Sequence, residues 1–209
     1  MAGSAFGKIV VATQIEYAIR DLLKLYFPMY LREIERIMSW EREELPTPRN
    51  YTNRNTFDAL PGEELPKVVV ISPGLLEPPE RVTGDGDYRA TWQVGVGVAI
   101  AARTEEEADF QVKMYAAAVR GIVLHNKSMG RDDIVGVYWL DENYDDLPID
   151  DQHANYKAAG NFFGVEVEGT INTFMRPPLI TEAAQELGEI EKVIVTFPEV
   201  PHEVVTEEE

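Results

Sequence analysis

An alternating strand that leads directly into a capped helix, over residues 88–126, constrains the fold of this 209-residue chain more than any other segment. One face of the expected strand is bulky and carries Trp92, Val94, Val96, Val98 and Ile100. The other face is nearly bare and carries Gln93, Gly95, Gly97, Ala99 and Ala101. Because a bare face lets a helix or another subunit approach the backbone closely, this segment is suited to packing rather than to holding a substrate.

The helix that follows has a clear start and an excess of apolar residues. Thr104 and Glu107 form a capping box, which predicts a helix from this point to His125. One apolar stripe consists of Ala108, Val112, Tyr115, Val119 and Ile122 and is expected to cover the sheet. A second stripe consists of Phe110, Met114, Ala117 and Leu124 and is expected to contact the first helix or a second protein molecule. We therefore predict a subunit interface formed by Phe110, Met114, Ala117, Leu124, Gly95 and Gly97.

The remaining elements are expected on both sides of this unit. Apolar residues at steps of three and four predict helix over residues 8–43, either kinked at Pro28 or divided there into two helices. Strands are expected at 67–72, 134–140 and 162–174. Loops are expected at 46–66 and 73–87, which are rich in proline and glycine, and at the acidic segment 141–151.

These elements predict an α+β fold. Its sheet is expected to be mixed, mainly antiparallel, of about four strands, packed against a long N-terminal helix and a second central helix. Residues 1–176 would form this domain. Residues 177–209 would form an extended C-terminal arm with one or two helical turns at 181–189, a strand at 193–197 and an acidic tail.

The charge of the chain limits its partners. A formal net charge of -18 and a pI near 4.5 argue against a general nucleic-acid binder or a ligand of anionic membranes, since both require clustered Lys and Arg. The chain has no cysteine, which excludes a disulfide framework and thiolate metal sites. No span approaches the roughly 20 apolar residues of a membrane helix. We expect the protein to be made and used, or assembled, in a cytoplasm.

No pattern in the sequence indicates catalysis. His125, His153 and His202 lack metal-ligand spacing, and no nucleophile elbow or phosphate loop is present. The segment that begins at Asp141 matches the first positions of a calcium loop, but its sixth position is Asp146 instead of glycine. It is therefore expected to be a solvated acidic turn. We predict that the protein is not an enzyme and has no catalytic, cofactor or metal site.

The order of the elements resembles the tail terminator proteins of long-tailed, siphovirus-type bacteriophages. The likeness is carried by Leu65 to Gly74 (LPKVVVISPG), Tyr88 to Ile100 (YRATWQVGVGVAI) and Thr104 to Phe110 (TEEEADF) with the helix that follows, and it covers residues 8–175. This resemblance implies an α+β subunit that forms a homohexameric ring at the head-proximal end of the tail, after assembly in the host cytoplasm. It implies the major tail tube protein and a head completion or connector protein as partners, with DNA only in transit through the lumen.

A negative ring would repel DNA from its wall, so we expect lumen-facing acids at Asp141, Asp145, Asp146, Glu166 and Glu168. Two alternatives remain open. The chain could be another head-tail connector, neck or tail tube subunit of a virion. It could instead be a small acidic enzyme or binding module outside any virus.

Overall fold

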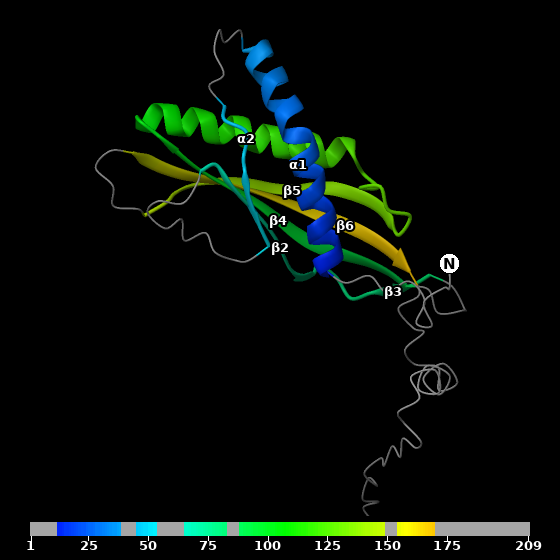
Figure 1. Ribbon diagram of the computed structural model, residues 1–209. Helices are drawn as coiled ribbons and strands as arrows, with labels where there is room; N and C mark the ends of the chain where they lie inside the picture. The colour runs from blue at the N-terminus through cyan, green and yellow to red at the C-terminus, as the bar shows by residue number, and fades with distance from the viewer. Residues whose placement is uncertain (1–11, 39–44, 54–64, 83–87, 149–153, 170–209) are drawn as a thin grey trace, which may run out of the picture.

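The computed structural model describes residues 12–38, 45–53, 65–82, 88–148 and 154–169 (Figure 1). Within them lie two helices and six strands. In chain order these are α1 (Ala12–Ile37), β1 (Asn50–Thr52), β2 (Lys67–Leu75), β3 (Glu80–Arg81), β4 (Tyr88–Ala102), α2 (Glu105–His125), β5 (Ile134–Asp146) and β6 (Asn155–Gly169). The predicted α+β class is confirmed. The arm predicted at 177–209 lies outside the described residues.

The strands form one mixed, mainly antiparallel sheet in the order β1-β2-β4-β6-β5, with β3 paired to β4. Only the β1–β2 pair is parallel. In the centre, β4 and β6 pair residue by residue from Tyr88↔Gly169 to Ala102↔Asn155. The described sheet has six strands where about four were expected, because β1 and β3 are short and lie in segments read as loops.

The core lies between one side of the sheet and both helices. Val94, Val96 and Val98 of β4 are buried against the helices, as the alternation predicted. We call this the helix side of the sheet. The other side carries Gly95 and Gly97, together with the residues that pair with them, and within the described residues no helix covers it.

The helix α1 continues through Pro28 as one helix, which decides between the two predicted alternatives. Its buried residues follow one another at a strict spacing of four, and they are Ile15, Ile19, Leu23, Phe27, Leu31 and Glu35. Because four residues turn an α-helix about 40° beyond a full turn, this line winds around the helix. The helix α1 therefore crosses the sheet and α2 obliquely, as Figure 1 shows.

The predicted start of α2 is confirmed. The Thr104 Oγ1 atom accepts a hydrogen bond from the Glu107 backbone N–H at 3.2 Å. The first apolar stripe of α2 is wholly buried, as expected, and includes Val112 and Tyr115. Beyond α1, the Glu35 carboxylate accepts from the Leu45 N–H at 2.9 Å and the Tyr115 hydroxyl donates to the Pro46 carbonyl at 2.5 Å, so both fix the chain that leads to β1.

Two strand boundaries were predicted wrongly. The acidic segment expected as a loop begins inside β5, which extends to Asp146. Its partner β6 begins at Asn155, seven residues before the expected start at 162, and pairs Ala158 with Asp145 and Lys157 with Asp146. Residues 170–174 of the expected strand lie outside the described part of the chain. An edge strand tolerates acids because solvent reaches it, so the acidic composition concealed the pairing.

A matched pair of substitutions on α1 tests the core. Leu23 is fully buried, whereas Leu25, two residues along, is 68% exposed. Leu23→Ala is expected to lower the free energy of unfolding by about 2 to 5 kcal/mol, because it removes buried methyl groups and leaves a cavity. Leu25→Ala is expected to change it by less than about 0.5 kcal/mol. Chemical denaturation measures both, and equal losses would contradict the placement of α1.

Candidate assembly surfaces

The second stripe of α2 is half-buried. Met114 and Leu124 pack against the core cluster from its margin, and Phe110 and Ala117 are also partly covered. The helix α1 comes close to α2 here, because the Tyr30 ring lies over Gly121 and its hydroxyl hydrogen-bonds with His125 Nδ1 at 2.5 Å. The second stripe was expected to contact either the first helix or a second protein molecule. The contact between α2 and α1 is present beside this stripe.

The two predicted interface glycines are buried in β4. A Cβ atom on Gly95 would lie 3.4 Å from Cε1 of Phe162, which is the residue paired with Gly95 from β6. The same arrangement recurs nearby, where a Cβ on Gly164 would meet the ring of its partner Tyr138. Aromatic side chains of the same chain thus occupy the space beside Gly95 and Gly164. The subunit interface at Gly95 and Gly97 remains a prediction.

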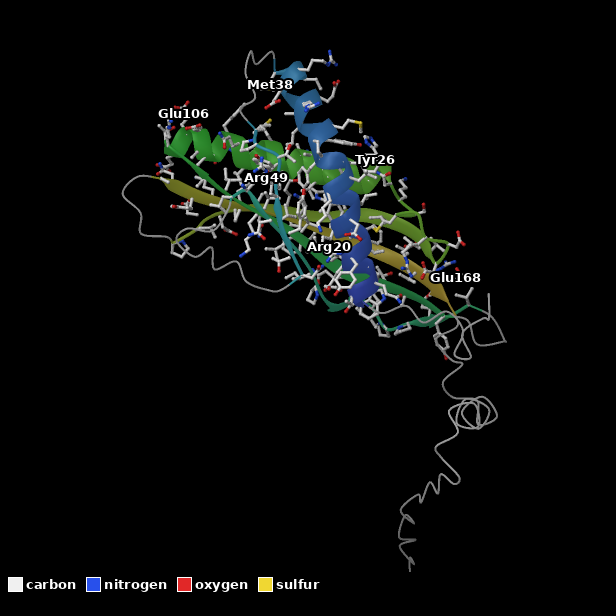
Figure 2. The ribbon with its side chains drawn as sticks, in the orientation of Figure 1. Arg20, Tyr26, Met38, Arg49, Glu106 and Glu168 are labelled. Carbon is white, nitrogen blue, oxygen red and sulfur yellow. The ribbon has the colours of Figure 1, made fainter. Side chains whose placement is uncertain are left out.

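Four of the five predicted lumen acids share the side of the sheet away from the helices. In the β5–β6 pairing, Asp141 lies opposite Phe162 and Asp145 lies opposite Ala158. Glu166 and Glu168 follow on the same side of β6 by alternation. Glu168 stands near the end of β6 (Figure 2) and accepts a salt bridge from Arg89 at 2.8 Å.

Asp146 is the exception among the predicted acids. It pairs with Lys157 on the helix side, where its carboxylate lies 3.0 Å from Lys157 Nζ. This contact assigns Asp146 to a different surface from the other four acids.

An apolar surface that the sequence did not reveal lies along β5. Five of its side chains are between 40% and 49% exposed: Val135, Tyr138, Trp139, Leu140 and Tyr144. We call them the β5 patch. The register of β5 shifts between Trp139 and Asp141, so a bulge places these two residues on different sides of the sheet. Trp139 and Tyr144 lie on the helix side, whereas Tyr138 lies on the other side. The outer edge of β5 pairs with no other strand of the described sheet.

Charged residues of α2 border the β5 patch. Arg120 donates to the Glu142 carboxylate at 2.5 Å and also lies over the Trp139 ring, 5.4 Å from its centre. Lys113 lies 5.9 Å from the centre of the Tyr144 ring. Each cation thus lies over a partly exposed aromatic ring of β5 and favours its position.

A second exposed apolar surface lies on α1. Leu25 and Met29, the latter 56% exposed, line an open groove of about 760 Å³. The other lining residues are Pro28, Tyr30, Arg32, Glu33, Arg36 and His125. We call this the α1 groove. Its two arginines make it one of the more basic parts of a strongly acidic chain, although Arg36 is already paired with Glu33.

The described residues offer no group of three or more His, Asp or Glu that could hold a metal ion. Neither α1 nor α2 has an apolar span of the length that crossing a bilayer requires.

Comparisons with known proteins give a structural likeness but no family. No family model matches the chain, and no curated protein matches it. Among solved structures, the chain is similar to one in a structure described as "Virion of native gene transfer agent (GTA) particle", with a TM-score of 0.37 and 19% identity. The match covers 57% of this chain and 78% of that chain. At this TM-score the likeness carries no functional argument, which rests instead on the surfaces described above.

Substitution of Glu142 tests the border of the β5 patch. The pKa of Tyr144 is raised to about 12. Partial burial is the larger cause, and the hydrogen bond that the Tyr144 hydroxyl donates to Glu142 is the second. Glu142→Gln is expected to lower this pKa while leaving it above 10, because partial burial remains. It is also expected to lower the free energy of unfolding by about 1 to 3 kcal/mol at pH 7.

The sign of the pH dependence follows from the raised pKa. The folded state favours neutral Tyr144, so this contribution to stability is complete below pH 10 and is lost as the pH rises toward 12. Unfolding at several pH values and the absorbance of the phenolate measure both effects. Asp145→Asn, an exposed acid-to-amide change on the same strand, is the control and should alter neither.

Proposed function

We propose that this chain is a structural subunit of a virion, a protein of the tail terminator type that forms a ring at the head-proximal end of a tail tube. The observation that carries this proposal is the presence of two different exposed apolar surfaces on one subunit, the β5 patch and the α1 groove. A ring requires heterologous contacts, in which a patch on one copy meets a different patch on the next. The order of the elements described above agrees with the terminator resemblance.

The acids of the sheet support a lumen in this ring. Asp141, Asp145, Glu166 and Glu168 lie on one side of the sheet, so that side can face the axis as a unit. Six copies, each with a formal charge of -18, would produce a strong negative field in which DNA passes without adhering to the wall. In this proposal the helices lie on the outside.

Two other functions compete with the terminator. Another head-tail connector or tube subunit would also form rings, and imaging its position in the tail separates it from a terminator. A non-viral binding module is favoured by one observation, the α1 groove, which combines an apolar floor with arginines and is suited to an acidic, apolar peptide. A monomer that binds such a peptide and never associates with itself would support the module.

Ring formation can be tested by negative-stain imaging of the purified protein alone and with tail tubes. The expected image is a ring of uniform diameter at one end of each tube. Trp139→Glu is expected to abolish the ring, because it places a charge in the centre of the β5 patch. Tyr17→Glu is the matched control, since Tyr17 and Trp139 are both 46% exposed, and it should leave the ring intact. A wild-type protein that stays monomeric beside tubes would overturn the proposal.

The role of the acids is tested in particles assembled with the variant Asp141→Asn, Asp145→Asn, Glu166→Gln. The expected result is slower release of DNA from the particle, because the wall loses part of its repulsion. Release is followed by the fluorescence of a dye that binds free DNA. Neutralising Glu105, Glu106 and Asp132, which are exposed elsewhere on the chain, is the control of equal charge change. Equal release rates in both variants would remove the lumen role.

A further inference from the structure

The outer edge of β5, which pairs with no other strand of the described sheet, can accept an added strand. Along Ile134–Leu140 (IVGVYWL) the edge has no lysine, arginine, proline or acid, the residues with which proteins usually protect an exposed edge. Val135, Trp139 and Leu140 are exposed along it. The opposite edge of the described sheet is formed by β1, which has only three residues and offers a much shorter edge for pairing. The β5 edge is therefore the part of the sheet best suited to main-chain pairing with a partner.

We infer that this edge accepts the segment Lys192–Phe197 (KVIVTF) of a neighbouring copy as an added antiparallel strand. This inference rests on the proposed ring. The segment lies outside the described residues, and its sequence has the β-branched and aromatic composition of a strand, followed by Pro198, which ends it. More than twenty residues separate it from the end of β6 at Gly169 and allow a reach of up to roughly 70 Å.

Charge sets the direction of the added strand. The half of β5 beyond Leu140 is acidic, with Asp141 and Glu142 first. Lys192 is the only Lys or Arg in residues 177–209 and directly precedes the apolar run. An antiparallel strand that begins at Lys192, beside Asp141, brings its apolar residues onto the apolar half of β5 and offsets the acid at the junction. The pairing ends at Lys192, because the next residue back, Glu191, would lie opposite Glu142.

In this register an aromatic residue of the added strand also meets a glycine of β5. In this sheet Gly95 is covered by its cross-strand partner Phe162, and Gly164 is covered by Tyr138. With Lys192 opposite Asp141, residue-by-residue pairing places Phe197 opposite Gly136. A Cβ atom on Gly136 would lie 3.1 Å from Glu166 Oε2, so the Phe197 ring would share this space with Glu166. Ile194 then meets Trp139.

The competing apolar run of similar composition is Ile9–Val11, which also follows a lysine. It is joined almost directly to the start of α1 at Ala12. A segment tied so closely to α1 has too little chain to pair freely with a neighbour's edge, whereas Lys192–Phe197 has the reach that donation between copies requires.

Two variants and their mixture test the inference. Val195→Asp damages the donor strand, and Trp139→Asp damages the acceptor edge; each alone is expected to abolish rings. Val204→Asp, the same change in the same C-terminal region but outside the strand, is the control and should form rings. The full-length proteins are compared by light scattering and imaging, with circular dichroism to verify folding.

Mixing the two defective variants distinguishes donation between copies from pairing within one chain. The Trp139→Asp protein keeps an intact donor and the Val195→Asp protein keeps an intact acceptor, so one productive contact forms and stops there. The expected product is a heterodimer that neither variant forms alone. If the strand is donated within one chain, the mixture stays monomeric, and the inference is overturned.

The register is tested by engineered cysteines, since the natural chain has none. Two proteins, one with Val195→Cys and the other with Tyr138→Cys, are expected to form an intermolecular disulfide on mild oxidation, because these residues face each other in the proposed pairing. Val204→Cys with Tyr138→Cys is the control for random collision. Equal cross-linking in both mixtures would overturn the register. Rings that persist in Val195→Asp would overturn strand addition while leaving the proposed ring function in place.

Discussion

The burial of one face of β4 under two crossing helices is the contact on which the rest of the structure depends. Val94, Val98 and their neighbours are removed almost completely from water, and each such side chain contributes about 1.5 to 3 kcal/mol relative to an exposed position. A slip of one residue in the pairing with β6 would turn all of them to the wrong side. The register of the central strands is therefore strongly fixed, and with it the side on which every acid and aromatic of β5 and β6 must lie.

Local signals made the central unit predictable. The bounds of β4 agree with the alternation, and the capping box located the start of α2, because both patterns depend on residues close together in the chain. The second half of β5 and the first half of β6 could not be found in this way. Segment 157–161 (KAAGN) lacks β-branched residues, and each strand is stabilised by pairing with the other across the sheet.

The exposed surfaces were harder to predict than the fold for a related reason. Periodicity showed that α2 has two apolar stripes, but only the crossing of α1 near Gly121 decides how much of the second stripe is covered. On β5 the bulge after Trp139 reverses the expected alternation. Without it, Asp141 would share the side of Trp139; with it, Asp141 joins Glu166 on the other side. No pattern in a single strand indicates where its partner will impose a bulge.

The bulge also separates two kinds of side chain that regular alternation would place on one side of β5. The side of the sheet away from the helices receives Asp141 and Glu166, whereas Trp139 and Tyr144 turn toward the α2 side, where Arg120 and Lys113 lie over their rings. Copies that each carry a formal charge of -18 repel one another, so association requires apolar burial large enough to outweigh that repulsion. Aromatic side chains at a strand edge provide this apolar burial, and only a few side-chain torsion angles become ordered when they are buried. The proposed ring thus needs both products of the same bulge. One strand of thirteen residues supplies the apolar edge and, with Glu166 and Glu168 of β6, the acidic wall.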